Sequence, residues 1–188
     1  KIEKDPNDSK VAAALAVNAL YKEVFRESVD SDTFDLQYKK SFVQGIKKLV
    51  KSEILNEKLL EYDLKKLSEA LMPERDRKFK YLGLQILIDR YFIRSNNKII
   101  ESPQAFWMRI AMGLALNEDN KEERAIEFYN LFSNLLYTPS TPTLFNSGTT
   151  HSQLSSCYLN TFDDSIDGIF EGVWQEARKS KYAGGLGF

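Results

Sequence analysis

The only cysteine of the sequence, Cys157, directly follows two serines, Ser155 and Ser156, at the end of a hydroxyl-rich stretch. A thiol in such a place can act as a nucleophile, donate a proton or supply electrons by forming a disulfide. It can equally be a small buried hydrophobic residue of a strand, the more ordinary role of a lone cysteine. The serines and the polar loop favour a strand end that faces a polar pocket, because loops on a rigid scaffold often supply binding groups.

His151 is the only histidine and stands shortly before Cys157, so the two form a candidate dyad of a cysteine hydrolase. Their spacing is local and no signature of a known hydrolase surrounds the cysteine, which argues against this chemistry. A hydrolase would also need an acidic Cys157 thiol that is alkylated selectively. One cysteine and one histidine do not complete a zinc site without carboxylates, and no Glu-x-x-His pair of a di-iron site is present, so we expect no metal site.

A second candidate is the segment Asp163–Ile166, where a helix is expected to begin. Asp164 or Ser165 can cap this helix by accepting hydrogen bonds from its first backbone N–H groups, and Asp163 suits the positive end of the helix dipole. The same helix start can instead hold a nucleotide, because exposed backbone N–H groups bind phosphate and a carboxylate can bind a ribose hydroxyl. The two roles are compatible, and the residues alone leave both open.

The third candidate is the glycine-rich turn Ala183–Gly187. Glycines let a backbone approach a ligand closely and adopt positive φ, but a glycine turn after a helix is also an ordinary C-terminal cap. The turn is not a Walker A sequence, because no Lys-Ser/Thr pair follows, and it is not a complete dinucleotide-binding fingerprint. Taken alone, it does not define a site.

The elements before residue 138 are predicted to be almost entirely helical. Apolar residues recur there at three- and four-residue spacing, which is the pattern of amphipathic helices with one buried side. Two short apolar runs around Asn96 and Asn97 predict a small hairpin between these helices. The helices are expected over residues 8–25, 35–54, a short stretch that ends before Pro73, 78–91, 102–116 and 121–137.

The composition changes at Thr138, where a stretch rich in proline and hydroxyl residues and almost free of charge begins. This stretch predicts a loop and a boundary. A strand is then expected over residues 156–162, a helix over 166–179, and a further strand after the glycine turn. Strand, helix and strand in this order are typical of the opening of an α/β layer.

The 188 residues contain 43% hydrophobic and 28% charged residues, which is the balance of an ordinary soluble globular protein. A formal net charge of -1 supplies no general field for a nucleic-acid backbone or an anionic membrane. No apolar run is long enough to span a bilayer and the charged start is unlike a signal peptide. We therefore expect a cytoplasmic protein with no nucleic-acid or membrane partner, and we expect both ends of the sequence to be cuts.

Four segments, read in order, resemble the large subunit of ribonucleotide reductases, and their order is more specific than any one of them. The residues Glu101–Gln104, with Phe106, Trp107 and Arg109 on the next helix, resemble the pattern just before the catalytic barrel of that family. The resemblance covers essentially the whole chain and is strongest from Glu101 onward. The four segments are Thr141–Gly148, Gln153–Cys157, Asp164–Asp167 and Ala183–Gly185.

The resemblance implies a mainly α fold in which an N-terminal helical domain is followed by the first strand–helix unit of a ten-stranded α/β barrel. Residues 1–26 look like the last helix of an ATP-cone-like region. Residues 27–137 correspond to the helical N-terminal domain with its small hairpin. Residues 138–188 correspond to the beginning of the catalytic barrel.

The family reduces ribonucleotides to deoxyribonucleotides for DNA synthesis by thiol and radical chemistry. In it, a cysteine thiyl abstracts the 3′ hydrogen of the substrate, and the 2′-hydroxyl leaves as water with the help of a redox-active cysteine pair. Cys157 matches one member of that pair. By the same resemblance, the substrate is contacted by Thr141, Ser156, Ala183 and Gly184, and the allosteric site for ATP or deoxynucleotide effectors includes Asp164, Ser165 and Ile166.

The resemblance also implies partners, since one cysteine cannot form a redox pair and the thiyl cysteine is missing as well. The chain alone is expected to be inactive and to need the remainder of the large subunit, and it is expected to form a homodimer near the effector site. A metal-containing small subunit is the expected radical source, with adenosylcobalamin as the second choice, and no cofactor is expected on this chain itself. Thioredoxin or glutaredoxin is the expected reductant of the cysteine pair.

A different class of function remains open beside this one. An all-helical interaction or adaptor module without catalysis would explain residues 1–137. It would not require the Thr-Pro loop, the Ser-Ser-Cys strand and the glycine turn to occur together. An adaptor should bind no deoxynucleotide, which separates the two hypotheses.

Overall fold

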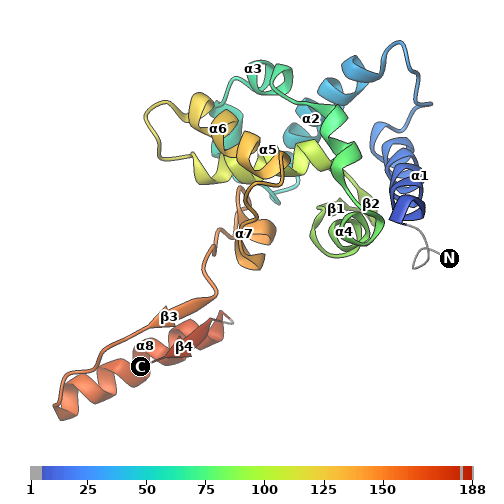
Figure 1. The fold of residues 1–188 in the computed structure, drawn as a ribbon. Coiled ribbons are helices and arrows are strands. Elements are labelled where there is room, and N and C mark those ends of the chain that lie inside the picture. The colour runs from blue at the N-terminus through green and yellow to red at the C-terminus, as the bar shows by residue number, and fades with distance from the viewer. Residues whose placement is uncertain (1–5, 183, 188) are drawn as a thin grey trace.

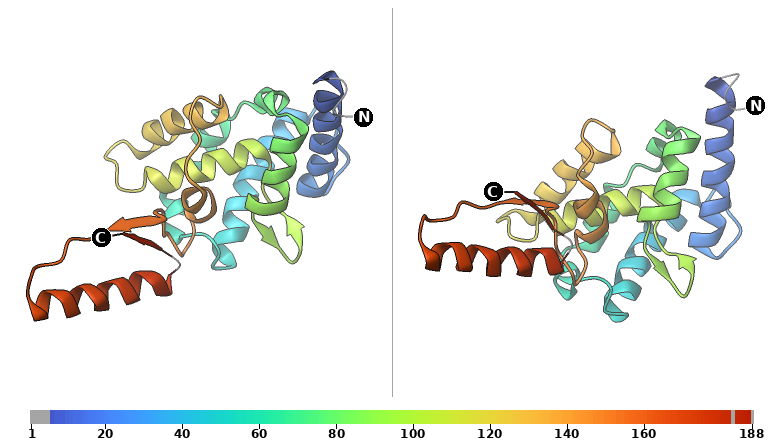
Figure 2. Two further views of the ribbon diagram at one scale, coloured as in Figure 1. Left: turned by 60° about the horizontal axis from the view of Figure 1, so that its bottom comes forward. Right: turned by 90° about the horizontal axis from the view of Figure 1, so that it is seen from below.

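The computed structural model describes residues 6–182 and 184–187 and is mainly helical, as the sequence predicts (Figure 1). A body of packed helices extends to about residue 150. A smaller C-terminal unit projects from this body, and the two further views show the same separation (Figure 2).

The first two helices pack against each other through one side each. Helix α1 (Pro6–Phe25) and helix α2 (Phe34–Lys51) carry apolar residues one helical turn apart, so each helix buries a stripe and leaves its charged residues in water. Aromatic rings pack edge to face where the two helices approach, with the Tyr21 and Tyr38 ring centroids 5.7 Å apart. The buried residues of the two helices, which also pack on α3, α4 and other elements of the body, are Ala13, Val17, Leu20, Tyr21, Tyr38, Phe42, Ile46 and Leu49.

Short elements connect α2 to the centre of the body. The predicted hairpin is confirmed: β1 (Arg94–Ser95) and β2 (Lys98–Ile99) pair antiparallel. Asn96 and Asn97 between them have φ of 53° and 60°, the left-handed conformation that a two-residue hairpin turn requires. The other short elements are η1 (Glu57–Glu61), α3 (Leu64–Glu69), η2 (Pro73–Lys78), α4 (Tyr81–Ile86) and η3 (Leu87–Tyr91).

Helix α5 (Pro103–Leu114) lies at the centre of the body, and all residues from Pro103 to Met112 are buried. Ser102 takes the extended N-cap conformation before a proline at the first helical position, as the sequence predicts. Helix α6 (Lys121–Ser133) packs along α5 through its own apolar side. A helix buried on every side must satisfy its polar side chains internally.

Two networks of hydrogen bonds satisfy the side chains of Gln104 and Arg109. The Asp76 carboxylate accepts hydrogen bonds from the hydroxyls of Tyr21 (2.6 Å) and Tyr38 (2.9 Å) and from Nε2 of Gln104 (2.6 Å). The hydroxyl of Tyr129 donates to the other side-chain atom of Gln104, Oε1, at 2.7 Å. The second network joins Arg109 to Glu101 and is described with the site.

Three expected helix boundaries differ from the structure: two helices end earlier than the apolar pattern suggests, and one begins later. Helix α2 stops at Lys51, and Glu53 beyond it has a φ of 57°. Helix α6 stops at Ser133, with Leu135 at a φ of 60°. The expected helix over residues 78–91 begins only at Tyr81, because Phe79 is extended, and it ends in a π-helical turn.

The structure also contains a helix that the sequence does not predict, α7 (Thr141–Asn146), inside the expected loop. A segment with two threonines and a proline has little intrinsic helical preference. Tertiary packing forms it instead: Leu144 is buried, and the Ser147 hydroxyl donates to the carbonyl oxygen of Ile110 at 2.8 Å. Beyond it, Thr149 pairs with Leu55 in an isolated bridge, so the chain is still attached to the body here.

The C-terminal unit is a strand, a helix and a strand. Strands β3 (Cys157–Leu159) and β4 (Gly185–Gly187) pair in parallel, and α8 (Ile166–Lys181) connects them. The Phe162 ring lies over Gly172, the one buried residue of α8 in the described part of the chain, where an added Cβ would lie 2.3 Å from the ring. None of the helices in the described part of the chain combines the length and apolar composition that crossing a bilayer requires.

Candidate functional site

Cys157 is the first residue of β3 and its side chain is exposed. Its Sγ lies 3.5 Å from the hydroxyl oxygen of Ser156. The residue opposite in the parallel strand is Gly185, whose N–H donates to the carbonyl oxygen of Ser156 at 2.6 Å. The structure therefore brings the Ser156–Cys157 strand and the glycine turn together, although 28 residues separate Cys157 from Gly185 in the sequence.

The glycines of the turn are required by close packing. A Cβ at Gly184 would lie 2.8 Å from a ring carbon of Tyr158, and the Gly184 N–H donates to the carbonyl oxygen of Lys179 at the end of α8. A Cβ at Gly185 would lie 3.6 Å from the Cys157 sulfur, so glycine keeps this side of the thiol open. Ala183, a candidate substrate contact, lies outside the described residues.

Tyr158 is a site residue that the sequence does not single out. Its ring fills the space beside Gly184, and its hydroxyl donates to the carbonyl oxygen of Ser155 at 3.2 Å. The Lys179 ammonium lies 5.9 Å from the ring centroid. Tyr158 thus fixes the glycine turn against the strand that carries Cys157, and the only sequence signal for it is an aromatic residue next to the cysteine.

Thr141 is the first residue of α7 and is exposed. Its hydroxyl lies 3.2 Å from the Tyr91 hydroxyl, and the ring of Tyr91 stacks on Phe145 with 4.6 Å between centroids. Within residues 6–182 and 184–187, no hydrogen bond joins Thr141 to Ser156 or Gly184. These candidate substrate residues lie in different parts of the structure, one on the body and two on the C-terminal unit.

A buried ion pair holds α7 on the body. Arg109 on α5 is fully buried, and its Nε donates to Glu101 Oε1 at 2.6 Å. The same guanidinium donates to the carbonyl oxygens of Ser147 at 2.6 Å and Leu144 at 3.3 Å. Gly113 on α5 permits this contact, because a Cβ there would lie 2.2 Å from the backbone nitrogen of Gly148. The Glu101 and Arg109 pattern noted in the sequence is therefore the attachment of the loop that bears Thr141.

A few hydrogen bonds connect the body to the C-terminal unit. The hydroxyl of Thr143 donates to the carbonyl oxygen of Leu154 at 3.0 Å, and Nδ2 of Asn146 donates to that of Gln153 at 2.7 Å. Nε2 of Gln153 in turn donates to the carbonyl oxygen of Tyr182 at 2.9 Å. The Thr-Pro segment thus positions the start of β3 directly.

The candidate effector residues stand at the start of α8. Ser165 is the N-cap, and its hydroxyl oxygen accepts a hydrogen bond from the N–H of Gly168 at 3.0 Å, as the capping hypothesis predicts. Asp164 and Ile166 are exposed, Ile166 with 72% of its surface accessible. The apolar side chains that follow on one face of the helix are exposed as well. They are Ile169, Phe170, Val173 and Trp174.

The structure brings His151 beside Tyr182, with 6.1 Å between ring centroids. In the part of the chain that the structure describes, no contact joins His151 to Cys157, so the geometry gives no support to a hydrolytic dyad. The same described residues contain no group of three or more His, Cys, Asp or Glu side chains arranged to hold a metal ion.

Comparisons with known proteins agree with this description. The family model described as the all-alpha domain of ribonucleotide reductase matches residues 77–152, from η2 through the Thr-Pro segment. This range includes the buried Glu101–Arg109 pair and α7.

Curated relatives match along the whole chain. The "Ribonucleoside-diphosphate reductase subunit alpha" of Chlamydia muridarum is 46% identical over 187 residues, which is 99% of this chain. The protein of the same name from Helicobacter pylori strain 26695 is 40% identical over 190 residues, and the "Ribonucleoside-diphosphate reductase large subunit" of Monkeypox virus is 38% identical over 185. The chain spans 18% of the length of the first of these relatives and 23% of the other two. The resemblance predicted from the sequence is thereby confirmed.

Proposed function

We propose that this chain, similar along its whole length to large subunits of ribonucleoside-diphosphate reductase, forms part of such a catalytic subunit and takes part in reducing ribonucleotides to deoxyribonucleotides. One observation carries the proposal: an exposed thiol stands at the start of a strand, directly opposite a glycine turn that leaves one side of it open.

In the proposed reaction, Cys157 is one of two thiols that reduce the substrate. The 2′-hydroxyl leaves as water after accepting a proton, and the two thiols together supply two electrons and two protons as they form a disulfide. The products are a deoxyribonucleotide, water and the oxidised cysteine pair. A serine in the same place could donate a proton but could not supply the electrons. A single cysteine in 188 residues means that the partner thiol and the thiyl cysteine are contributed by other residues of the subunit.

The substrate is proposed to lie between the body and the C-terminal unit. Ser156 and Gly184 would contact the substrate through a hydroxyl and the backbone, and Ala183 is a further proposed contact. Thr141 would contribute from the start of α7. Because Thr141 stands on the body, the hydrogen bonds of Gln153 and Tyr182 that connect the two parts would set its distance from the thiol.

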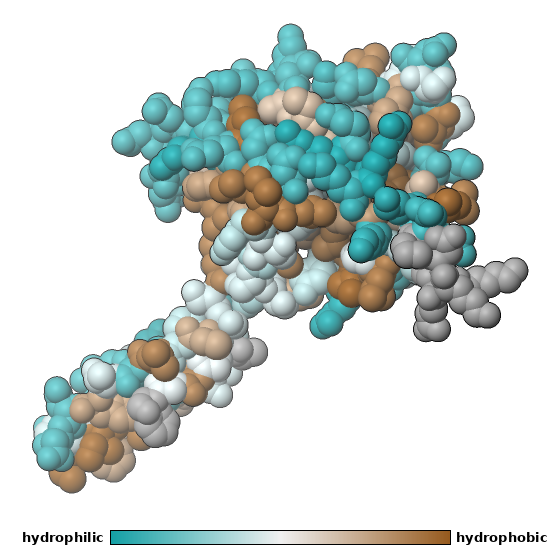
Figure 3. Space-filling view, in the orientation of Figure 1, coloured by the Kyte–Doolittle hydropathy of each residue, from teal (hydrophilic) through white to brown (hydrophobic). Residues whose placement is uncertain are grey.

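The start of α8 is proposed as the allosteric site for deoxynucleotide effectors, with Asp164, Ser165 and Ile166 as its residues. Backbone N–H groups at a helix start favour phosphate. The exposed apolar face of α8, brown on the projecting unit in Figure 3, suits a homodimer contact next to this site. A second copy of the subunit would bury that face.

The remaining parts of the enzyme are proposals of the same kind. The C-terminal unit would be the first strand–helix unit of the α/β barrel, and α1 would be the last helix of an ATP-cone-like region. A metal-containing small subunit would supply the radical, with adenosylcobalamin as the alternative source. Thioredoxin or glutaredoxin would reduce the disulfide after each turnover, and the isolated chain would be inactive.

The test of the proposed chemistry is Cys157→Ser in a full-length subunit that contains this chain. We expect nucleotide binding to persist and multiple turnover to be lost, because serine cannot complete the disulfide. Deoxynucleotide formation over many turnovers is the measurement, and Ser155→Ala serves as a matched control next to the thiol. Sustained production by the cysteine variant would refute the assignment.

Asp164→Ala tests the effector site and separates the reductase from the adaptor hypothesis. We expect deoxynucleoside triphosphate affinity of the dimer to fall by about tenfold or more, the usual scale for a lost hydrogen bond to a charged group. Asp167→Ala removes the same charge from the first turn of α8, three residues beyond Asp164, and is expected to have a smaller effect. A wild-type dimer that binds no deoxynucleotide would favour an interaction module without catalysis.

A further inference from the structure

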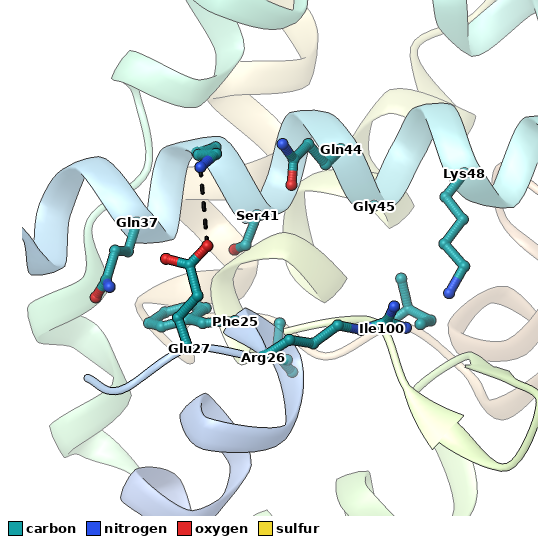
Figure 4. A pocket seen from close by; sticks show the side chains of 11 residues that line it. Phe25, Arg26, Glu27, Gln37, Ser41, Gln44, Gly45, Lys48 and Ile100 are labelled. Atoms are coloured by element: carbon teal, nitrogen blue, oxygen red, sulfur yellow. Dashed lines mark ion pairs between the residues drawn. The ribbon is translucent and has the colours of Figure 1, made fainter.

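A pocket lies where three elements of the body meet: the end of α1, one side of α2 and the chain just after β2 (Figure 4). It is distant in the fold from Cys157 and from the start of α8 (Figure 1). Its volume is about 120 Å³. A space of this size holds several water molecules, so it suits a small polar group such as a phosphate.

Cationic side chains line this pocket and the hollow that adjoins it. Arg26 follows the last residue of α1, Lys48 points down from α2, and the charged ends of both side chains are drawn near Ile100 in Figure 4. Lys98 on β2 lines an adjoining hollow that shares Arg26 and Glu27 with the pocket. Among the described residues, none of these three cations forms an ion pair or a side-chain hydrogen bond.

The acidic residues nearby do not neutralise them. Glu27 lines the same pocket, but its carboxylate faces Lys40 at 3.9 Å. Glu23 uses a carboxylate oxygen to accept a hydrogen bond from the N–H of Ile99 at 2.7 Å. The cluster therefore keeps an excess of positive charge, which is unusual in a chain whose formal net charge is -1.

We propose that this pocket binds a phosphate group, with Arg26 and Lys48 as its direct ligands and Lys98 as the third positive charge. A guanidinium matches two phosphate oxygens at once, and an ammonium supplies a compact charge from the opposite side. Gln44 lies on the rim and adds an amide donor. Val24, Phe25 and Ile100 form an apolar floor that lowers the local dielectric and strengthens the charge interaction.

The electrostatics of Lys48 agree with this assignment. Burial lowers the pKa of its ammonium, and the positive charges of Arg26 and Lys98 lower it further. A bound anion would relieve both penalties. It would also tie the end of α1 to α2 and the hairpin, so the ligand would act on how firmly α1 is held to the body.

The experiment is a calorimetric titration of the 188-residue chain with inorganic phosphate and with tripolyphosphate at constant ionic strength. We expect saturable binding that Lys48→Gln weakens by about tenfold or more, the scale of a hydrogen bond to a charged group. Lys47→Gln removes the same charge from the neighbouring exposed position of α2 and should leave the affinity within about twofold, since surface charges at a distance are screened. Circular dichroism verifies that both variants fold alike.

A third variant is expected to change the phosphate affinity in the opposite direction. Glu27→Gln removes the one carboxylate that lines the pocket and releases Lys40, so phosphate should bind several-fold more tightly. A general destabilisation of the fold cannot lower the phosphate affinity of the Lys48 variant and raise that of the Glu27 variant. Absence of phosphate binding by the wild-type chain, or equal affinities of the Lys48 and Lys47 variants, would overturn the proposal.

The source of the phosphate is distinguished by titrating adenosine and ATP in parallel. ATP binding that Lys48→Gln weakens, with none for adenosine, identifies the phosphates of a nucleotide as ligands. Binding of inorganic phosphate that is as tight as that of ATP identifies the free ion. Both results support a phosphate site in this pocket. ATP binding that Asp164→Ala weakens and Lys48→Gln leaves unchanged would place the nucleotide at the start of α8. That result would count against the phosphate site in the pocket.

Discussion

Helices α5 and α8 are similar in length and opposite in surroundings. Nearly every residue of α5 is buried, including the charged Arg109, whereas α8 buries only Gly172 among its described residues. The side chains of Gln104 and Arg109 on α5 find their partners within the body. The apolar face of α8 is exposed (Figure 3), and the thiol of Cys157 is exposed as well.

This difference separates two kinds of residue that look alike in a sequence. The charged and hydroxyl residues around α5 hold the body and the Thr-Pro segment in place. The chemical groups of the C-terminal unit are exposed, so any pocket around them must be completed by further surface. The body should therefore respond to mutation through its stability, and the C-terminal unit through binding and turnover.

The largest effect is expected for Arg109→Ala. It leaves the Glu101 carboxylate buried without its partner and removes donors from two carbonyl oxygens of the α7 segment. Breaking a buried ion pair on one side typically costs about 3–5 kcal/mol. Chemical denaturation measures the free energy of unfolding.

The control is Arg124→Ala on α6. Arg124 is half-exposed and pairs with Glu127 at 2.6 Å and Glu118 at 3.5 Å. Exposed pairs contribute about 0–1 kcal/mol, so this variant should remain close to the wild type. Similar losses for the two arginines would show that the body does not depend on its buried network.

The next largest effect is a dependence of the free energy of unfolding on pH, caused by Asp76. Burial raises the pKa of Asp76 from 3.8 to about 6, against the opposing hydrogen bonds from Gln104, Tyr21 and Tyr38. The carboxyl group of Asp76 therefore binds its proton more tightly in the folded protein than in the unfolded chain. The stabilisation of the fold by this proton is complete below pH 3.8 and is lost as the pH rises to about 6. Each unit of pKa difference corresponds to about 1.4 kcal/mol, which makes the total decrease about 3 kcal/mol.

The measurement is the free energy of unfolding between pH 4 and pH 7 for the wild type and for Asp76→Asn. The difference between the two curves isolates the aspartate, because the amide does not titrate. We expect the wild type to lose stability relative to the variant as the pH rises. Parallel curves would mean that Asp76 keeps an ordinary pKa despite its burial.

The smallest effect is expected for Ser165→Ala, which removes the N-cap of α8. Losing a serine cap costs about 1 kcal/mol. Because α8 is exposed and has few contacts with the body, the loss should appear as faster hydrogen exchange in α8 with little change in α5. Ser180→Ala, near the other end of the same helix, should leave exchange unchanged. Equal changes in both helices would indicate that the body and the C-terminal unit unfold together.

Much of the architecture was predictable from local patterns. The hairpin followed from Asn96 and Asn97, the start of α5 from Ser102 and Pro103, and the cap of α8 from Ser165. The helix α7 was not predictable, because its stability comes from contacts with Arg109 and Ile110 and not from its own residues. The early ends of α2 and α6 had no clear local signal either.

The candidate site also has features that local sequence determines and features that only tertiary packing determines. The sequence by itself determined which residues could do chemistry and where strands and helices form around them, since caps, turns and periodicity act over a few neighbouring residues. Only the tertiary structure decided that Gly185 lies opposite Cys157, that Thr141 stands apart on the body, and that Arg26 and Lys48 line one pocket beside Lys98. The proximity of these residues depends on which distant segments pack together. The free energy of the whole fold determines that packing.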